Sequence, residues 1–453
     1  MKVIIVGAGI TGLTLGYLLV KKGFDVTVLE KEARVGGLAK SYHYNGWSID
    51  IGPHRFHTDD SVVKDFILKI MEDRLIEIPR DSKVFFYDSH YEWPLCLRSV
   101  LKLPPSLILR AFLDLLNRPP IKDDSYESYV LNRYGKTLTN CFFKEFNYKF
   151  LKVDLKEMHR HWAETGINRA TIEKNIRMSS IVDLLLEVLS PRHVDTRFLY
   201  PKHGPIDIFP ERLKEMIQEE GGKVEPGIRI KKATVENKEI KTFESSDGIK
   251  WESDFVFWTG VIHDLESLLG YEPSQLGYCS TVLCNLLVEG TPPVPSQWEY
   301  FGSSRIIFSR TSTNIYFNPC LAPEGYYGIC AELVCYEEDF VWRKAETLLN
   351  SIIQNLIQTG IVHNFNSIVD VHFEQVSNTY PIYRMDYLTQ LEKYKTKIES
   401  IKNVLACGRI GGFWYNNMDH AIRSSIDIAD MVDDEKFTET GSFPIKGIYR
   451  GDF

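Results

Sequence analysis

The chain has 453 residues and a formal net charge of −8, with 44% hydrophobic and 25% charged residues. These values are ordinary for a soluble globular protein of two or three domains, and the negative charge argues against a nucleic-acid partner, which would need a basic surface. No apolar run reaches about 18 residues, so we expect no transmembrane segment. Eight cysteines without a CxxC pair favour reduced thiols and a cytoplasmic location over a disulfide framework.

The first part of the chain has the pattern of a dinucleotide-binding unit. A β-branched run at 2–6 predicts a buried parallel strand, GAGITG follows as a turn into a helix, and DVTVLE predicts a second strand that ends on Glu30. Gly7 permits the tight turn, Gly9 lets the backbone approach a pyrophosphate, and Gly12 lets the helix pack on the strand. The helix N-terminus would bind the phosphates, and Glu30 would bind the ribose hydroxyls. The predicted contacts of this unit are Gly7, Gly9, Ile10, Thr11, Gly12, Glu30 and Lys31.

A second pair of glycines follows in EKEARVGGLAK, where Arg34 precedes Gly36 and Gly37. The arrangement resembles the FAD-binding N-terminus of the amine-oxidase and protoporphyrinogen-oxidase group of flavoproteins. The resemblance implies an α/β fold with a Rossmann-type, GR2-like FAD-binding domain, and FAD as the cofactor. A second glycine turn would let the backbone pass close to the flavin end of FAD, with Gly37 and Leu38 as contacts.

The loop IGPHRFHTDD at 51–60 contains two histidines, His54 and His57. A metal site would need three or more ligands, and cysteine and histidine are sparse nearby, so we expect no metal. The loop resembles the corresponding loop of UDP-galactopyranose mutase, a flavoprotein of the same superfamily. The resemblance implies that His54 lies beside the isoalloxazine ring and that His57 supports the loop. The alternative is that both histidines only hydrogen-bond within the loop.

An apolar stretch at 97–117, broken by Pro104 and Pro105, predicts an amphipathic helix. We expect this helix to be buried, with a membrane contact as the alternative.

A helical insertion that contains this helix is expected over 91–194. In the mutases the insertion carries a tryptophan and, further along, an arginine. Here Leu151 and Gly166 stand in those two positions, with Arg169 near the second, and Trp162 belongs to a different part of the pattern. The resemblance therefore implies a similar scaffold with a different substrate pocket.

The centre of the chain adds two further similarities. Residues 198–222 resemble the strand, loop and helix with which the superfamily re-enters the FAD domain, and the β-rich run after them would contact the adenine end near Ile228. RIIFSR at 305–310, followed by TNIYFNP, resembles the mutase strand that carries a diphosphate-binding arginine. The resemblance places Arg310 in that role, because a guanidinium fork suits a phosphate better than an ammonium does; a surface arginine is the alternative.

The C-terminal part contains a strand, NVLACGR, and an amphipathic helix, MDHAIRSSIDIADMV. In the superfamily this segment returns to the FAD domain, which implies flavin contacts at Gly408, Arg409, Met418 and Asp419. The start of the helix would direct N–H groups at the ring oxygens that gain electron density on reduction.

Two tyrosines in this part match the mutase as well. The resemblance places Tyr380 and Tyr415 at the substrate diphosphate, with core tyrosines as the alternative. Asn417 stands where the mutase has an acid.

The expected organisation is discontinuous. Residues 1–90, 195–265 and 395–435 would form the FAD-binding domain, 91–194 the helical insertion, 266–394 a mixed α+β substrate domain with an antiparallel sheet, and 436–453 a tail.

The mutase resemblance implies an isomerase of polysaccharide biosynthesis that interconverts the pyranose and furanose forms of a nucleotide sugar. Reduced FAD would attack the anomeric carbon through N5, and NAD(P)H is a possible reductant. His54, Arg310, Tyr380 and Tyr415 would form the catalytic set. The alternative is an FAD-dependent oxidoreductase that oxidises or desaturates a small molecule. Either enzyme could be an oligomer.

Overall fold

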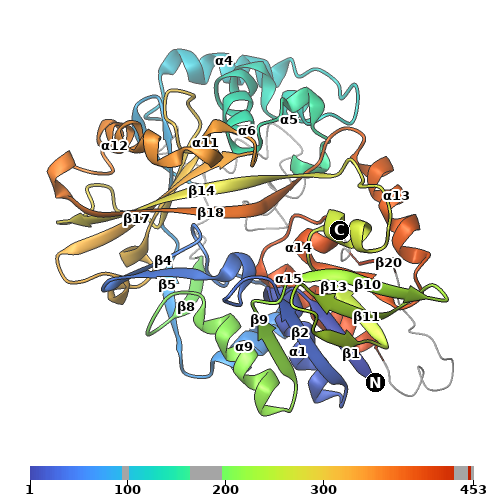
Figure 1. Cartoon of the computed structure of the whole chain (residues 1–453). Helices are drawn as coiled ribbons and strands as arrows, with labels where there is room; N and C mark the ends of the chain where they lie inside the picture. Colours follow the sequence, from blue (N-terminus) through green and yellow to red (C-terminus); the bar gives the residue numbers. More distant parts are fainter. Residues whose placement is uncertain (94–100, 164–195, 433–446, 450–453) are drawn as a thin grey trace.

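The computed structural model describes residues 1–93, 101–163, 196–432 and 447–449 (Figure 1). The structure is a mixed α/β fold in which a parallel sheet carries the N-terminal glycine motif, as the sequence predicted. Gly166 and Arg169 lie outside the described residues.

A six-stranded parallel sheet forms the first layer, in the order β20-β19-β13-β1-β2-β9. Its strands come from both ends and the middle of the chain, and every pair is parallel. The strands are β1 (Lys2–Val6), β2 (Asp25–Glu30), β9 (Lys223–Pro226), β13 (Phe255–Trp258), β19 (Val404–Ala406) and β20 (Gly447–Ile448). The central strands β1 and β13 are apolar because a parallel sheet is covered on both faces.

Four helices bury one face of this sheet, and they bring the N- and C-terminal segments together. Helix α1 (Ile10–Lys21) packs against α15 (Met418–Met431) and α9 (Ile208–Glu219), and α2 (Ser61–Met71) packs on α9 and α15. Asp60 caps α2, because its carboxylate accepts hydrogen bonds from the N–H groups of Val62 and Val63 at 2.9 and 3.3 Å. The aspartates that end the histidine loop therefore start a helix.

A seven-stranded sheet forms the second layer, in the order β18-β14-β17-β16-β15-β6-β7. Its strands are β6 (Ser82–Phe86), β7 (Ser89–Glu92), β14 (Gly277–Glu289), β15 (Trp298–Phe301), β16 (Arg310–Thr313), β17 (Tyr326–Cys335) and β18 (Ile368–Ile382). All pairs are antiparallel except β15 with β6. Pairing with β15 places β6 in this sheet, although its residues belong to the segment expected in the FAD-binding domain. Strand β16 begins at Arg310, so the strand expected over 305–310 is shifted by several residues.

Smaller elements connect the two layers. Three short sheets pair β3 (Ser41–Tyr44) with β4 (Trp47–Asp50), β5 (Leu75–Pro79) with β8 (Arg197–Pro201), and β10 (Ile230–Glu236) with β11 (Glu239–Ser245) and β12 (Lys250–Glu252). Among the described residues outside the insertion, the further α-helices are α10 (Ile262–Leu268), α11 (Phe340–Arg343), α12 (Leu349–Gln358), α13 (Tyr387–Glu399) and α14 (Gly408–Gly411).

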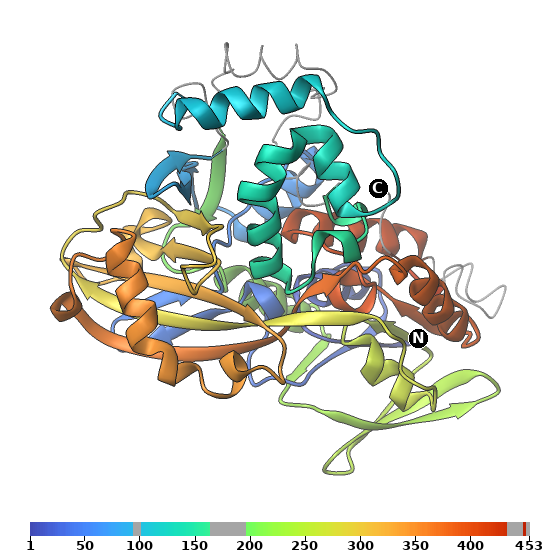
Figure 2. The ribbon, with the colours of Figure 1, turned by 90° about the horizontal axis from the view of Figure 1, so that it is seen from above.

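The described part of the insertion contains α4 (Pro105–Leu116), α5 (Tyr126–Leu138) and α6 (Lys144–Leu151). These helices lie together over one end of the second sheet, with α4 at the outer rim in both ribbon views (Figures 1 and 2). The expectation of a buried α4 was wrong in part: Leu107 is buried, whereas Leu109 and Leu116 are more than half exposed. None of the helices in the described ranges has the length and apolar character needed to cross a membrane.

Candidate functional site

The turn between β1 and α1 has the backbone geometry of a phosphate cradle. Gly7 adopts a φ of 104°, which favours glycine. A Cβ at Gly12 would lie only 1.9 Å from the Gly7 carbonyl oxygen, so close packing of helix on strand requires glycine there. A Cβ at Gly9 would meet no atom closer than the Gly37 Cα at 4.0 Å. Protein packing alone therefore does not require glycine at position 9, in keeping with a position that a ligand approaches.

Glu30 closes the other side of this turn. Its carboxylate accepts hydrogen bonds from the N–H groups of Ala8 and Glu32, at 2.7 and 2.9 Å, and the residue is buried. The Ile228 N–H donates to the Glu30 carbonyl oxygen at 2.7 Å, which brings the expected adenine contact next to the expected ribose contact. Lys31, which follows, is exposed.

The second glycine turn lies directly beside the first. Gly36 and Gly37 have φ angles of 109° and 56°, and the Gly36 N–H donates to the Ala8 carbonyl oxygen at 2.8 Å. Leu38 packs against the cluster around Trp47. A Cβ at Gly37 would lie 3.1 Å from the Gly9 Cα, so the close approach of the two turns restricts position 37.

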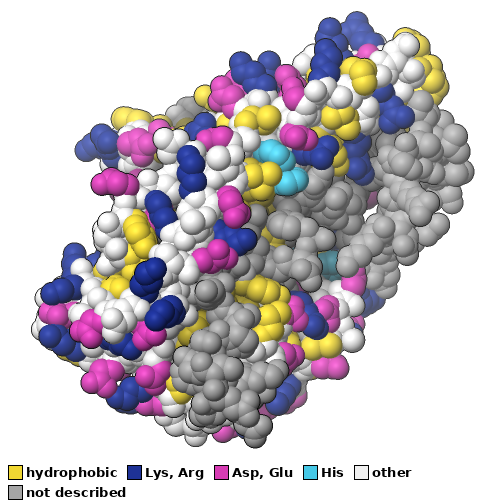
Figure 3. Space-filling model, turned by 90° about the vertical axis from the view of Figure 1, so that its right-hand side faces the viewer, with side chains coloured by type: hydrophobic (Ala, Val, Ile, Leu, Met, Phe, Trp, Pro, Cys, Tyr) yellow, Lys and Arg dark blue, Asp and Glu magenta, His cyan; other side chains and the backbone are white. Residues whose placement is uncertain are grey.

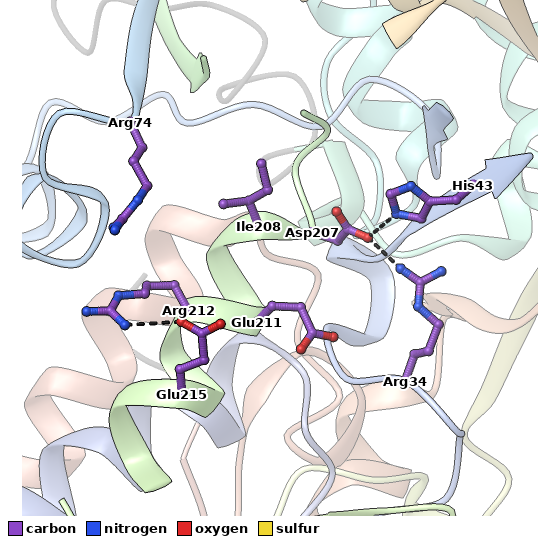
Figure 4. Close-up of a pocket in the computed structure, with 8 residues that line it drawn as sticks. All are labelled: Arg34, His43, Arg74, Asp207, Ile208, Glu211, Arg212 and Glu215. Carbon is purple, nitrogen blue, oxygen red and sulfur yellow. Dashed lines mark hydrogen bonds and ion pairs between the residues drawn. The ribbon is translucent and has the colours of Figure 1, made fainter. Parts of the chain in front are cut away.

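Arg34 holds this second turn in place. It donates to the Ser41 carbonyl oxygen at 2.9 Å and forms an ion pair with Asp207 at 2.6 Å. Figure 4 shows this pair at the edge of a cavity of about 590 Å³, where His43 also contacts Asp207 at 2.7 Å and Arg212 contacts Glu215 at 3.1 Å. Because the charges that line this cavity are largely paired with one another, we assign it no ligand.

The C-terminal segment completes the cradle from the opposite direction. A Cβ at Gly408 would lie 2.9 Å from the Thr11 hydroxyl oxygen, and the Ser425 hydroxyl donates to the Thr11 carbonyl oxygen at 3.2 Å. Helix α15 starts at Met418, and the side chain of its N-cap residue, Asn417, forms no capping hydrogen bond.

The first turns of α1 and α15 thus both present backbone N–H groups near the glycine turns, where an anionic dinucleotide would be stabilised. The residues present fit a dinucleotide such as FAD. Asp419, in the first turn of α15, lies 2.9 Å from His420 Nδ1.

His54 lies close enough to Arg310, Arg55 and Arg409 for their charges to act on its ring. Its backbone N–H donates to the Gly52 carbonyl oxygen at 2.9 Å. Its ring Nδ1 is buried and has no hydrogen-bond partner among the residues described. Burial and the charges of Arg310 and Arg55 lower the pKa of His54 to about 3, so the ring is neutral at physiological pH. A buried nitrogen without a partner fits a position that faces a ligand. His57 instead packs edge-on against Phe198, with ring centroids 5.3 Å apart.

Arg310 is oriented by a buried carboxylate that the sequence analysis did not identify. Its Nε and one terminal nitrogen donate to the two Glu332 oxygens at 2.6 and 2.7 Å, and the same terminal nitrogen approaches the Tyr380 hydroxyl at 3.3 Å. Burial would lower the pKa of Arg310, but Glu332 raises it well above its ordinary value. For Tyr380, burial raises the pKa of the hydroxyl group. The histidine loop passes over this pair, since a Cβ at Gly52 would lie 2.5 Å from a Glu332 oxygen.

Arg409 joins the two predicted tyrosines. Its guanidinium carbon lies 4.9 Å from the centre of the Tyr380 ring and 4.6 Å from that of Tyr415. It donates to the carbonyl oxygens of Thr379, at 2.7 and 3.0 Å, and of Asn416, at 2.8 Å. All the donors described for Arg409 therefore go to backbone carbonyls, and the side chain fixes the tyrosines relative to each other.

Trp162 is a site residue that the sequence analysis placed elsewhere. Its ring stacks on Tyr415 with a centroid separation of 4.5 Å and lies edge-on to Tyr380 at 6.4 Å. Its segment is anchored by the His159 N–H, which donates to the Tyr383 carbonyl oxygen at 2.8 Å. Leu151, in the mutase tryptophan position, is fully buried in the surrounding core. No local pattern around Trp162 indicates a contact with residues more than 200 positions away.

Two further arginines extend the site. The Arg55 guanidinium lies between Phe198 and Trp298, 5.0 and 4.5 Å from their ring centres, and Arg80 lies 5.6 Å from Trp298. Burial lowers the pKa of both, that of Arg55 to about 10. Neither forms an ion pair with a carboxylate in the described part of the chain. In the sequence, the position of Arg55 inside the motif GPHRFHT could have indicated that it belongs to this site. The described residues contain no cluster of three or more potential metal ligands.

The chain is similar in sequence to known proteins, over its first part and over most of its length. Residues 5–69 match the family model of the NAD(P)-binding Rossmann-like domain. A probable UDP-galactopyranose mutase of Klebsiella pneumoniae is 22% identical over 438 residues, which cover 94% of each chain. An L-amino-acid oxidase of Crotalus adamanteus is 37% identical over 86 residues, but the match spans only 16% of the oxidase and 19% of this chain.

Solved structures extend the similarity to the whole fold. A reduced UDP-galactopyranose mutase superposes with a TM-score of 0.81 at 18% identity, covering 99% of this chain and 98% of that one. A putative protoporphyrinogen oxidase from Exiguobacterium sp. has a TM-score of 0.75 at 16% identity, covering 95% and 98%. The chain is therefore similar to a probable UDP-galactopyranose mutase over nearly its whole length, shares the fold of a solved mutase, and matches the model of a Rossmann-like domain in its first part.

Proposed function

We propose that this chain binds FAD in the glycine cradle and interconverts the pyranose and furanose forms of a nucleotide sugar. One observation carries the proposal: Arg310, Tyr380 and Tyr415 converge on one side of the cradle, next to the unpartnered nitrogen of His54. Bound reduced FAD would supply the nucleophile for the anomeric carbon of the sugar.

The residues around the cradle would hold the cofactor. The N–H groups at the starts of α1 and α15 would bind the pyrophosphate and the electron-rich side of the flavin. Neutral His54 adds no charge beside the ring and offers a ring nitrogen as a hydrogen-bond partner.

The substrate diphosphate would lie against Tyr380, Tyr415 and Arg310. Because Glu332 cancels the charge of Arg310, this arginine contributes mainly directed hydrogen bonds. The net positive charge comes from Arg55, Arg80 and Arg409, none of which forms an ion pair with a carboxylate among the described residues. A buried cation without a carboxylate is costly unless an anion joins it, and this favours an anionic substrate.

The second candidate function is an FAD-dependent oxidoreductase that oxidises or desaturates a small molecule. It is favoured by the N-terminal similarity to L-amino-acid oxidases and by the structural similarity to a putative protoporphyrinogen oxidase. Such an enzyme needs no diphosphate site, whereas a mutase does. The arginine and tyrosine cluster therefore favours the mutase.

The test is to incubate dithionite-reduced protein with UDP-, GDP- and dTDP-sugars, add cyanoborohydride, and search for a flavin-sugar product by mass spectrometry. We expect a product with at least one nucleotide sugar and release of the free nucleotide. No product with any sugar, together with oxygen uptake in the presence of an amine or porphyrinogen, would support the oxidoreductase.

Arginine variants locate the substrate. We expect Arg310→Ala to weaken nucleotide-sugar binding by about 10- to 100-fold, while the flavin stays bound, because directed hydrogen bonds to the diphosphate are lost. Arg305→Ala is the matched control, since Arg305 belongs to the same stretch but is exposed and 3.7 Å from Asp88. Equal affinity of the two variants would remove Arg310 from the substrate site.

A further inference from the structure

Helix α4 exposes a continuous apolar stripe at the rim of the molecule. Leu109, Phe112, Leu113 and Leu116 follow one another at helical spacing and are 59%, 39%, 49% and 55% exposed. Leu101 and Ile121 flank the helix and are 69% and 47% exposed. We call these six residues the α4 stripe. Contiguous exposed apolar side chains of this kind mark an interaction surface.

The opposite side of α4 is already used for packing. Leu107 is buried in a cluster with Val84 and Tyr91, and Asp114 accepts a hydrogen bond from the Thr137 N–H at 2.5 Å. A Cβ at Gly135 would lie 2.6 Å from the Asp114 Cβ, so α4 and α5 are closely packed. The orientation of α4 is thus fixed, and the α4 stripe faces outwards because of it.

Basic residues surround the α4 stripe. Residues 101–122 contain Lys102, Arg110, Arg118 and Lys122, and Asp114 is their only acid. Asp114 points inwards, as described above, so the exposed charge of this segment is positive, in a chain with a net charge of −8. The acids that follow are engaged locally: Asp123 accepts the Ser125 N–H at 2.9 Å, and Asp124 lies 3.3 Å from Arg160.

From these observations we propose that the α4 stripe binds the surface of a membrane that contains anionic lipids. Exposed leucine and phenylalanine side chains would enter the acyl boundary, and the four cations would lie at the level of the lipid phosphates. Figure 3 shows hydrophobic and Lys or Arg side chains, with Asp or Glu side chains among them, at the upper end of the molecule, where Figure 1 places α4 and α5.

A second copy of the chain fits the same surface less well. A two-fold interface brings the same patch of both copies together, so the four cations of one protomer would face those of the other. An anionic lipid surface complements both the apolar stripe and the cations.

The experiment is co-sedimentation of the full-length protein with vesicles of phosphatidylcholine alone or with about 30% phosphatidylglycerol. We expect binding to the anionic vesicles that is at least about tenfold stronger than to the neutral ones and weaker at high salt. Leu109→Ser/Phe112→Ser should abolish binding, whereas Phe340→Ser/Phe365→Ser, at exposed positions on the second layer, should not.

A charge variant gives a second readout that does not depend on the packing of α4. Lys102→Glu/Arg110→Glu should remove the preference for anionic vesicles, while Arg343→Glu/Lys344→Glu, also exposed, should keep it. The proposal is overturned if the unmodified protein does not sediment with anionic vesicles. It is also overturned if the serine variant only converts a dimer into a monomer in analytical ultracentrifugation, which would make the stripe an interface between copies.

Discussion

The glycine cradle and the proposed substrate side of the site are built in different ways. The cradle depends on backbone geometry within residues 7–37, where glycines remove side chains that would collide. The substrate side depends on side chains from distant strands and helices: Arg310 begins β16, Tyr380 lies near the end of β18, and Trp162 comes from the insertion. A local site is defined by a short motif, whereas an assembled site exists only after the sheets have paired.

A substitution at Gly12 tests the cradle, and we expect it to have the largest effect. In Gly12→Ala the new Cβ would lie 1.9 Å from the Gly7 carbonyl oxygen. Because that oxygen belongs to the backbone, the clash can be relieved only if the turn itself moves. We expect flavin content, measured as the ratio of flavin to protein absorbance, to fall by more than about tenfold. Gly277→Ala is the control, because a Cβ there meets no atom within 4 Å. Full flavin content in Gly12→Ala would show that the cradle tolerates side chains.

A substitution at Glu332 tests the part of the site that is assembled from distant strands and helices. Glu332→Ala leaves Arg310 buried without its carboxylate, and loss of one partner of a buried pair costs about 3–5 kcal/mol. We expect the free energy of unfolding in urea to fall by that amount, and any flavin bound to the remaining folded protein to keep its spectrum. Glu338→Ala, at an exposed position six residues along, should change nothing. Equal stability of both variants would mean that Arg310 finds another partner.

The interaction between the stacked rings of Trp162 and Tyr415 is a second test of the part assembled from distant residues. A double-mutant cycle with Trp162→Leu and Tyr415→Leu should give a coupling energy of about 0.5–1.5 kcal/mol, because stacked rings contribute beyond the area that they bury. In the control cycle Tyr17→Leu replaces the tyrosine change, since Tyr17 packs on Phe66 instead. Additive effects in both cycles would show that the stack is not formed in solution.

His54 provides a test that depends on pH. Its pKa is lowered from 6.5 to about 3 in the folded protein. As the pH falls, the unfolded chain therefore binds a proton at His54 at a higher pH than the folded chain does. The stabilising effect of the neutral ring is therefore present above pH 6.5 and is lost as the pH falls towards 3. We expect His54→Gln to reduce the loss of stability between pH 7 and pH 5, measured by urea unfolding. A His54 ring that titrates near pH 6.5 in NMR spectra would contradict this.

The sequence was sufficient where chemistry follows from neighbouring residues. The strand, turn and helix at the N-terminus were predicted correctly because glycine spacing and apolar periodicity act over a few residues. Trp162 and Glu332 could not be found in this way, because an ordinary buried tryptophan or glutamate has no local signature. Arg310 was expected at the end of a strand but begins one, since the pairing of β16 with β17 fixes its register.

Helix α4 shows a different kind of limit. Its pattern correctly predicted an amphipathic helix, but the same pattern describes a helix whose apolar side faces a core and one whose apolar side faces outwards. Only the packing of Leu107 and Asp114 against neighbouring elements decides which side is buried.

The order of strands in the first sheet has a consequence for biosynthesis. Strand β13 lies between β1, from the beginning of the chain, and β19, which starts at Val404. During translation one edge of β13 therefore has no partner strand until the residues of β19 have been synthesised. Until then the apolar strand β13 has an unpaired edge, and unpaired edges of this kind favour aggregation during folding.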